Sequence, residues 1–134
     1  LVDGFYREVV LCEAWGNARP EEGSEHFLAY CLESLTGEHY IHGNLIGMNV
    51  LISLFLQGDY AEFSIEEIKT FFEDIQIQIK PEDQNIHYAD IRKALQNVQN
   101  YVQKEDLQYS IYNSPHLTLD KEKIDEIILF LKNL

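Results

Sequence analysis

The sequence predicts a mainly α-helical fold, a bundle of five to six helices around a buried central helix over residues 41–57. Apolar residues recur three or four positions apart along most of the chain, which is the spacing of one helix face. Residues 41–57 carry apolar side chains on every side of a helix, as expected at the middle of a bundle. With 46% hydrophobic residues in 134, the chain can bury one core, so we expect residues 1–134 to form a single helical domain.

Two helices are expected before the central one. The first spans Val2 to Trp15, where Val2, Phe5, Val9 and Cys12 form one apolar stripe, and it ends at Gly16. A polar loop over 17–23 follows. The hydroxyl of Ser24 is expected to cap a second helix, which ends before Gly37 and has an apolar face made of Phe27, Leu28, Cys31, Leu32 and Leu35.

Three more helices are expected after Gly58, which ends the central one. Ser64 and Glu67 have the spacing of a capping box and open the next helix. Another helix covers 87–104, and the last begins near Thr118. The apolar faces of these last two helices are Ile91, Leu95, Val98 and Val102, and Ile124, Ile127, Ile128, Leu131 and Leu134.

Two short segments alternate apolar and polar residues with a period of two. In 75–80 isoleucine alternates with glutamine and lysine, and 107–112 shows a similar alternation. This period suits half-buried strands better than helices, so the two segments could pair as a small two-stranded ribbon.

Two glycines, Gly43 and Gly47, fall within the predicted central helix. A glycine inside a helix costs about 1 kcal/mol relative to alanine, so some compensation is expected. Our interpretation is that another helix lies tightly against this side; a ligand groove or a dimer seam is the alternative.

The charge is strongly negative and unevenly distributed. The chain has 23 acidic and 10 basic residues, and residues 1–68 contain twelve acids with only Arg7 and Arg19 as bases. Such a field repels nucleic acid and anionic lipid and favours encounter with basic surfaces. We therefore expect no direct nucleic-acid ligand and no membrane, and a basic protein partner; the alternative is that the acidity only maintains solubility.

The cysteines and the apolar runs indicate a cytoplasmic protein. Cys12 and Cys31 both sit at helical spacing among apolar residues, where we expect them reduced, with Cys31 buried and inert. No segment resembles a signal peptide, and the longest apolar run, Leu45 to Leu56, falls short of the ~20 residues that span a bilayer.

No known catalytic or metal-binding motif is present in the sequence. His39 and His42 lie three apart, whereas a zinc protease needs histidines four apart with a glutamate after the first. Calcium loops and phosphate-binding glycine loops are absent, and so is the glutamate-histidine spacing of di-iron bundles. We therefore expect no metal, no cofactor and no catalytic residue.

The leading functional hypothesis is a non-catalytic acidic module that binds a basic protein. It would be a stoichiometric inhibitor of the immunity or antitoxin kind, or a nucleic-acid mimic. The candidate partner-binding residues are Glu13, Trp15, Glu21, Glu22, Glu25, Glu33, Glu38 and Tyr40.

Two other hypotheses stay open on the sequence alone. One is a small helical enzyme, or a metal or small-ligand binder, with its site near His39 and His42 beside Tyr40. The other is one domain of a larger assembly that recognises partners through an apolar patch. The oligomeric state is open under each hypothesis.

Overall fold

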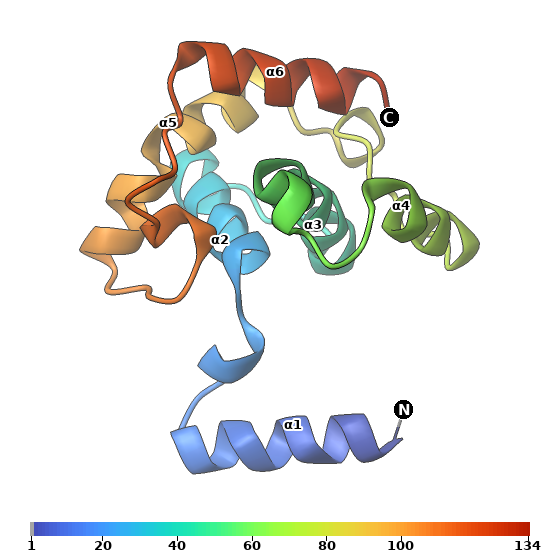
Figure 1. Ribbon diagram of the computed structural model, residues 1–134, viewed down its shortest axis with the longest axis vertical. Helices are drawn as coiled ribbons and strands as arrows, with labels where there is room; N and C mark the ends of the chain where they lie inside the picture. The colour runs from blue at the N-terminus through green and yellow to red at the C-terminus, as the bar shows by residue number, and fades with distance from the viewer. Residues whose placement is uncertain (1) are drawn as a thin grey trace.

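Six α-helices and four short 3-10 turns make up the computed structural model, which describes residues 2 to 134 (Figure 1). The α-helices are α1 (Val2–Trp15), α2 (Ser24–Thr36), α3 (His42–Gln57), α4 (Ile65–Asp74), α5 (Tyr88–Lys104) and α6 (Lys121–Lys132). The 3-10 turns are η1 (Arg19–Glu21), η2 (Gly58–Tyr60), η3 (Glu82–Gln84) and η4 (Ile111–Asn113). The predicted mainly α-helical class is confirmed.

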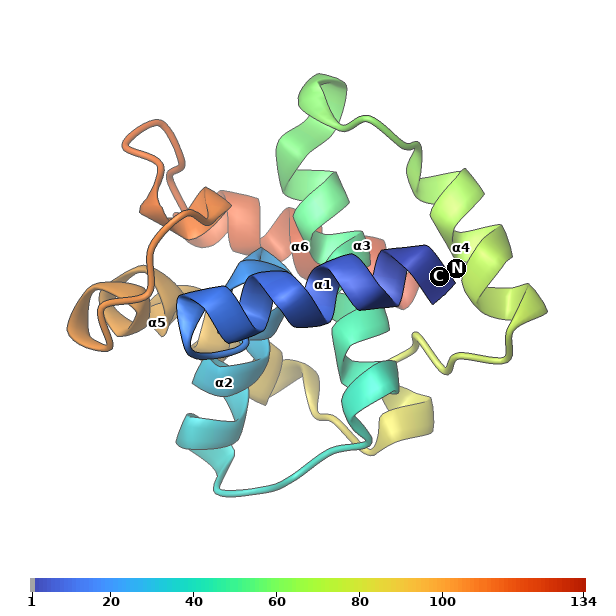
Figure 2. The same ribbon diagram turned by 90° about the horizontal axis from the view of Figure 1, so that it is seen from below.

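Helix α3 lies at the centre of the molecule, as the sequence predicts. It packs against α2 on one side and α4 on the other, while α5 packs on α2 and α6 packs on α5 (Figures 1 and 2). Its buried residues are Leu45, Gly47, Met48, Asn49, Leu51, Ile52 and Ser53. Because these residues occur on several sides of the helix, α3 can only be stable inside a shell of other elements.

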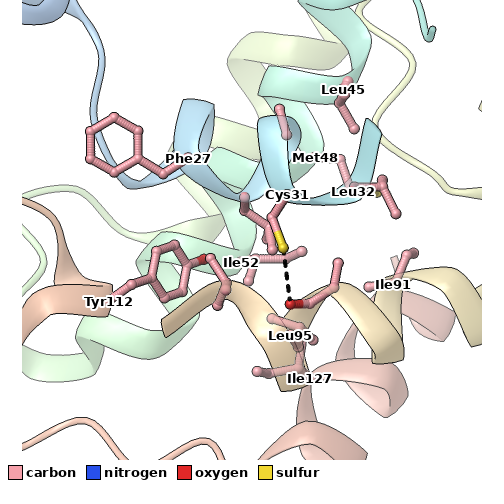
Figure 3. Packing of buried hydrophobic residues seen from close by; sticks show 14 of the residues in the cluster. Phe27, Cys31, Leu32, Leu45, Met48, Ile52, Ile91, Leu95, Tyr112 and Ile127 are labelled. Atoms are coloured by element: carbon pink, nitrogen blue, oxygen red, sulfur yellow. Dashed lines mark hydrogen bonds between the residues drawn. The ribbon is translucent and has the colours of Figure 1, made fainter. Parts of the chain in front are cut away.

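The core joins α2, α3, α5 and α6 with Tyr112 of η4 (Figure 3). Phe27, Cys31 and Leu32 of α2 meet Leu45, Met48 and Ile52 of α3, together with Ile91, Leu95 and Ile127 from the two later helices. The Cys31 Sγ–H points at the Ala94 carbonyl oxygen, 3.6 Å away, and burial raises the pKa of this thiol to about 11. Cys31 is therefore buried and reduced, as expected.

Side-chain capping is present at the starts of α4 and α6 and absent at those of α2, α3 and α5. The predicted capping box of Ser64 and Glu67 is present at α4. Helix α6 begins at Lys121, where the Asp120 carboxylate accepts the Lys123 N–H at 2.8 Å. Ser24, however, does not cap α2, because its hydroxyl oxygen accepts the distant Ile111 N–H at 2.9 Å.

The predicted two-stranded ribbon is wrong, since residues 2 to 134 contain no strand. Gln76 has φ of 61° and Tyr109 has φ of 67°, and a left-handed residue interrupts the extended backbone that a strand requires. The alternating isoleucines instead cover α3: a Cβ built on Gly47 would lie 2.8 Å from Ile77 Cγ2 and 3.5 Å from Ile79 Cγ2. The element packed closely against Gly47 is therefore mainly this extended segment, and not the helix that the sequence led us to expect.

Helix α1 forms as predicted, but its apolar stripe is not buried. The helix lies apart from the other five in Figure 1 and has no buried residue. Its large apolar side chains are exposed, for example Val2 by 80%, Phe5 by 58% and Val9 by 56%. The amphipathic pattern therefore identified the helix correctly but not a packing partner within this chain.

In the described range, 2 to 134, every helix is too short or too polar to cross a lipid bilayer. The cytoplasmic location stays a prediction.

The two glycines of α3 should respond in opposite ways to alanine. Gly47→Ala places a methyl group against Ile77 and should lower the free energy of unfolding by about 1–3 kcal/mol, as overpacking does. Gly43→Ala meets no atom within 4 Å and should leave it unchanged or raise it by up to about 1 kcal/mol. Urea denaturation of both variants measures the difference, and equal effects would contradict the packing described for Gly47.

The Cys31 thiol should be unreactive in the folded chain. In a Cys12→Ser background, a thiol reagent at pH 8 should modify less than about 1% of Cys31 in the time that modifies it fully in urea, because burial keeps it protonated and inaccessible. Because the pKa of Cys31 is higher in the folded chain than in the unfolded chain, its contribution to stability is complete below the unfolded pKa and is lost as pH rises through the folded one. The protection of Cys31 from the reagent should therefore weaken towards pH 11. Rapid modification at pH 8 without denaturant would contradict the burial of Cys31.

Candidate functional site

Two histidines from different helices face each other at the surface between α2 and α3. His26 is the third residue of α2 and His42 is the first residue of α3. Their ring centroids are 5.2 Å apart, with the ring planes inclined at 50°. The His26 side chain is 17% exposed, whereas His42 is an exposed residue, so the pair opens towards solvent on the His42 side.

Glu25 fixes the orientation of the His26 ring. Its Oε1 atom lies 2.9 Å from His26 Nδ1 and accepts the Gly23 N–H at 3.0 Å. Burial by itself raises the pKa of the Glu25 carboxyl, but the bonds from His26 and from the backbone N–H groups of Glu25 and Gly23 lower it below its ordinary value. An ionised Glu25 therefore holds Nδ1 as a donor and leaves His26 Nε2 free to accept a proton or bind an ion.

This arrangement can act on a ligand in two ways. A free imidazole nitrogen can take a proton from a hydroxyl group, and imidazole is also a common ligand of zinc and other transition metals. Across residues 2 to 134, His, Cys, Asp and Glu side chains form no cluster of three or more that could hold a metal ion. The pair thus offers two protein ligands at most.

The structure separates the two histidines of the alternative site that the sequence suggested, His39 and His42. His39 is 92% exposed, and its Nδ1 lies 3.7 Å from Glu33 Oε1. It lines a groove of about 550 Å³ together with Tyr40 and His87, whereas His42 turns to His26. The spacing of three suggested a shared helix face, but α3 begins only at His42, so His39 lies in the preceding loop.

The candidate partner-binding residues fall into two groups. Glu13, Glu21 and Glu38 are exposed, and Trp15 is 63% exposed. The others are partly buried and engaged within the chain: Glu22 accepts the Tyr30 hydroxyl at 2.7 Å, Glu25 contacts His26, and Glu33 accepts the Tyr40 N–H at 3.2 Å. Half of the six carboxylates therefore already have internal partners.

Sequence reasoning missed the part that His26 plays. His26 and His42 are sixteen positions apart and belong to two predicted helices, so neither helical spacing nor a known motif connects them. The one available signal was that a histidine lies within the first turn of each of two successive helices, directly after Glu25 in one case. Only the crossing of α2 and α3 shows that the rings meet.

The comparisons with known proteins find partial similarity to proteins that are named as enzymes. No family model matches the chain, and no solved structure matches it. A protein of Thermoplasma acidophilum named glycerol-1-phosphate dehydrogenase (NAD(P)+) is 34% identical over 80 residues, which are 60% of this chain and 22% of that protein. The protein of the same name from Thermoplasma volcanium is 31% identical over 80 residues, which are again 60% of this chain and 22% of that protein. A third, from Saccharolobus islandicus, is 29% identical over 95 residues, 71% of this chain and 26% of that protein.

These relatives correct the leading functional hypothesis. The matches span about a quarter of the length of the relatives, so the chain is similar to one part of a larger enzyme. An inhibitor or immunity protein that neutralises a basic toxin is therefore the wrong interpretation. It rested on charge and on the absence of familiar motifs, and neither observation distinguishes an acidic inhibitor from an acidic piece of an enzyme. The basic protein partner stays an untested prediction.

The hydrogen bond from Tyr30 to Glu22 should contribute measurably to the stability of the fold. Tyr30→Phe should lower the free energy of unfolding at pH 7 by about 1–2 kcal/mol, because it leaves a partly buried carboxylate without its donor. Burial and the Glu22 carboxylate raise the pKa of Tyr30, so this stabilisation is present below pH 10 and is lost as pH rises further.

Tyr40→Phe is the matched control, since its hydroxyl lies 3.5 Å from Thr36 Oγ1, at the limit of a hydrogen bond. It should change the stability by less than about 0.5 kcal/mol. Urea denaturation at pH 7 and at pH 11 compares the variants, and equal losses in both would show that Glu22 is not held by Tyr30.

Proposed function

We propose that this chain is the helical, histidine-bearing part of an NAD(P)+-dependent dehydrogenase that acts on glycerol 1-phosphate or a closely related polyol phosphate. The support is the partial similarity to proteins named as such dehydrogenases in two Thermoplasma species and in Saccharolobus islandicus. The observation that carries the chemistry is the His26 and His42 pair, which brings two imidazoles together at the surface between α2 and α3.

Oxidation of an alcohol by NAD(P)+ moves a hydride from carbon to the nicotinamide, and the hydroxyl group loses its proton. An enzyme of this class must therefore orient the hydroxyl and favour its alkoxide form. Imidazoles do this either by accepting the proton or by holding a divalent ion. A bound ion such as Zn²⁺ supplies Lewis-acid chemistry, which lowers the pKa of an oxygen ligand.

The donor set fits one part of a divalent metal site. His26 Nε2 is the free nitrogen, and the Glu25 carboxylate on Nδ1 is the outer partner that metal-binding histidines commonly have. A catalytic zinc ion takes three protein ligands and keeps one position open. His26 and His42 would supply two of these ligands.

Metal binding tests the pair directly. Calorimetric titration with Zn²⁺ should show binding by the unaltered chain that weakens at least about tenfold in His26→Ala and in His42→Ala, because each removes one ligand. His39→Ala is the matched control and should keep the affinity within about twofold, since His39 lies outside the pair. Equal loss in all three variants would show non-specific binding and contradict the metal site.

The reaction itself is tested on the native protein that contains this chain, purified from its source. It should reduce NAD⁺ or NADP⁺ when glycerol 1-phosphate is added, and the His26→Ala and His42→Ala forms should lose nearly all of that activity while His39→Ala keeps it. A native protein that reduces neither nucleotide with this substrate would overturn the proposed function.

A further inference from the structure

Asn49 is the one fully buried polar residue of α3 that connects this helix to the start of α2. It is 0% exposed, and its Nδ2 donates to the Glu25 carbonyl oxygen at 2.9 Å. Its Oδ1 has no hydrogen-bond partner among the described residues. The side chain thus makes one hydrogen bond across 24 positions of sequence, to the residue directly before His26.

The same stripe of α3 carries His42. Residues seven apart on an α-helix lie on one face, so His42 and Asn49 both face the first turn of α2, about 10 Å apart along the axis of α3. One contact is the ring pair of His26 and His42, and the other is the bond from Asn49 to Glu25. Two contact points separated along a helix fix both the position and the rotation of the element that they hold.

Stability alone does not account for an asparagine at this place. Burying an amide with one unsatisfied atom costs free energy, so the unpartnered Oδ1 offsets part of what the bond to Glu25 contributes to stability. The two helices are also packed without it, through Phe27, Leu28 and Leu32 of α2 against Leu45, Met48 and Ile52 of α3. The bond therefore sets the relative orientation of α2 and α3, whose contact the apolar core already stabilises.

We infer that Asn49 is a positioning residue for the His26 and His42 pair: its bond to the Glu25 carbonyl sets the first turn of α2 so that the two imidazoles meet. The role of the histidine pair in this inference rests on the proposed function, whereas the geometry of the two contacts does not depend on a bound metal. Glu25 links the two contacts, because its side chain meets His26 Nδ1 and its backbone carbonyl oxygen accepts the bond from Asn49.

The test compares Asn49→Leu with Ser53→Ala. The leucine variant keeps the buried volume and removes the bond, whereas Ser53 is buried one turn further along the same stripe and makes no hydrogen bond to α2. In the metal-free chain, a nuclear Overhauser effect between the His26 and His42 ring protons should be present in the unaltered protein and in Ser53→Ala. It should be lost or strongly weakened in Asn49→Leu.

Zn²⁺ titration gives the second measurement. Asn49→Leu should bind Zn²⁺ on the order of tenfold more weakly than the unaltered chain, as removal of outer partners of a metal ligand does, and Ser53→Ala should bind it equally well. Urea denaturation reports stability separately, and Asn49→Ala, which removes the same bond with a smaller side chain, is measured alongside in case the leucine variant does not fold.

The outcomes separate the two proposals. If the folded Asn49 variants keep both the ring contact and the Zn²⁺ affinity, and only stability changes, Asn49 is not a positioning residue. If the ring contact disappears in these variants but His26→Ala binds Zn²⁺ as well as the unaltered chain does, Asn49 positions the rings and the metal site of the proposed function is wrong.

Discussion

Burial of α3 on nearly every side is the constraint on which the other elements depend. Its apolar residues point in several directions, and each direction needs a cover: α2 on one side, α4 and the extended segment over 77–79 on another, and η4 with Tyr112. Leu51 and Ile52 have no exposed surface, and burial of such side chains contributes roughly 1.5–3 kcal/mol each. The functional geometry follows from this packing, because α2 must cross α3 closely to cover it.

Close packing of α2 on α3 also explains why a polar site can exist at its margin. In the middle of the contact the side chains are apolar, and polar groups there must find partners within the protein. At the start of α2 the contact reaches the surface, where His26, His42 and Glu25 keep access to solvent. Asn49 lies between these two environments, fully buried yet bonded to the backbone beside the histidines.

The acidic composition acquires a different meaning once the relatives are considered. Three carboxylates of the first half are partly buried and bonded: Glu22 to Tyr30, Glu25 to His26, and Glu33 to the backbone of Tyr40. These bonds fix both ends of α2 and the loop that follows it. The net charge of the chain is therefore in part a by-product of local structure, and it is weak evidence about partners.

The sequence by itself determined the helices and the buried faces of α2, α3, α5 and α6, because the 3.6-residue period and the capping box at Ser64 act over a few neighbouring residues. It also determined that α3 is the central helix, since a helix that is apolar all round has no other stable place. Only the tertiary structure decided what the isoleucines of 75–80 cover, that the stripe of α1 stays exposed, and that His26 meets His42. Each of these depends on how elements cross, which is set by packing between residues far apart in the chain and leaves no periodic signal in the sequence.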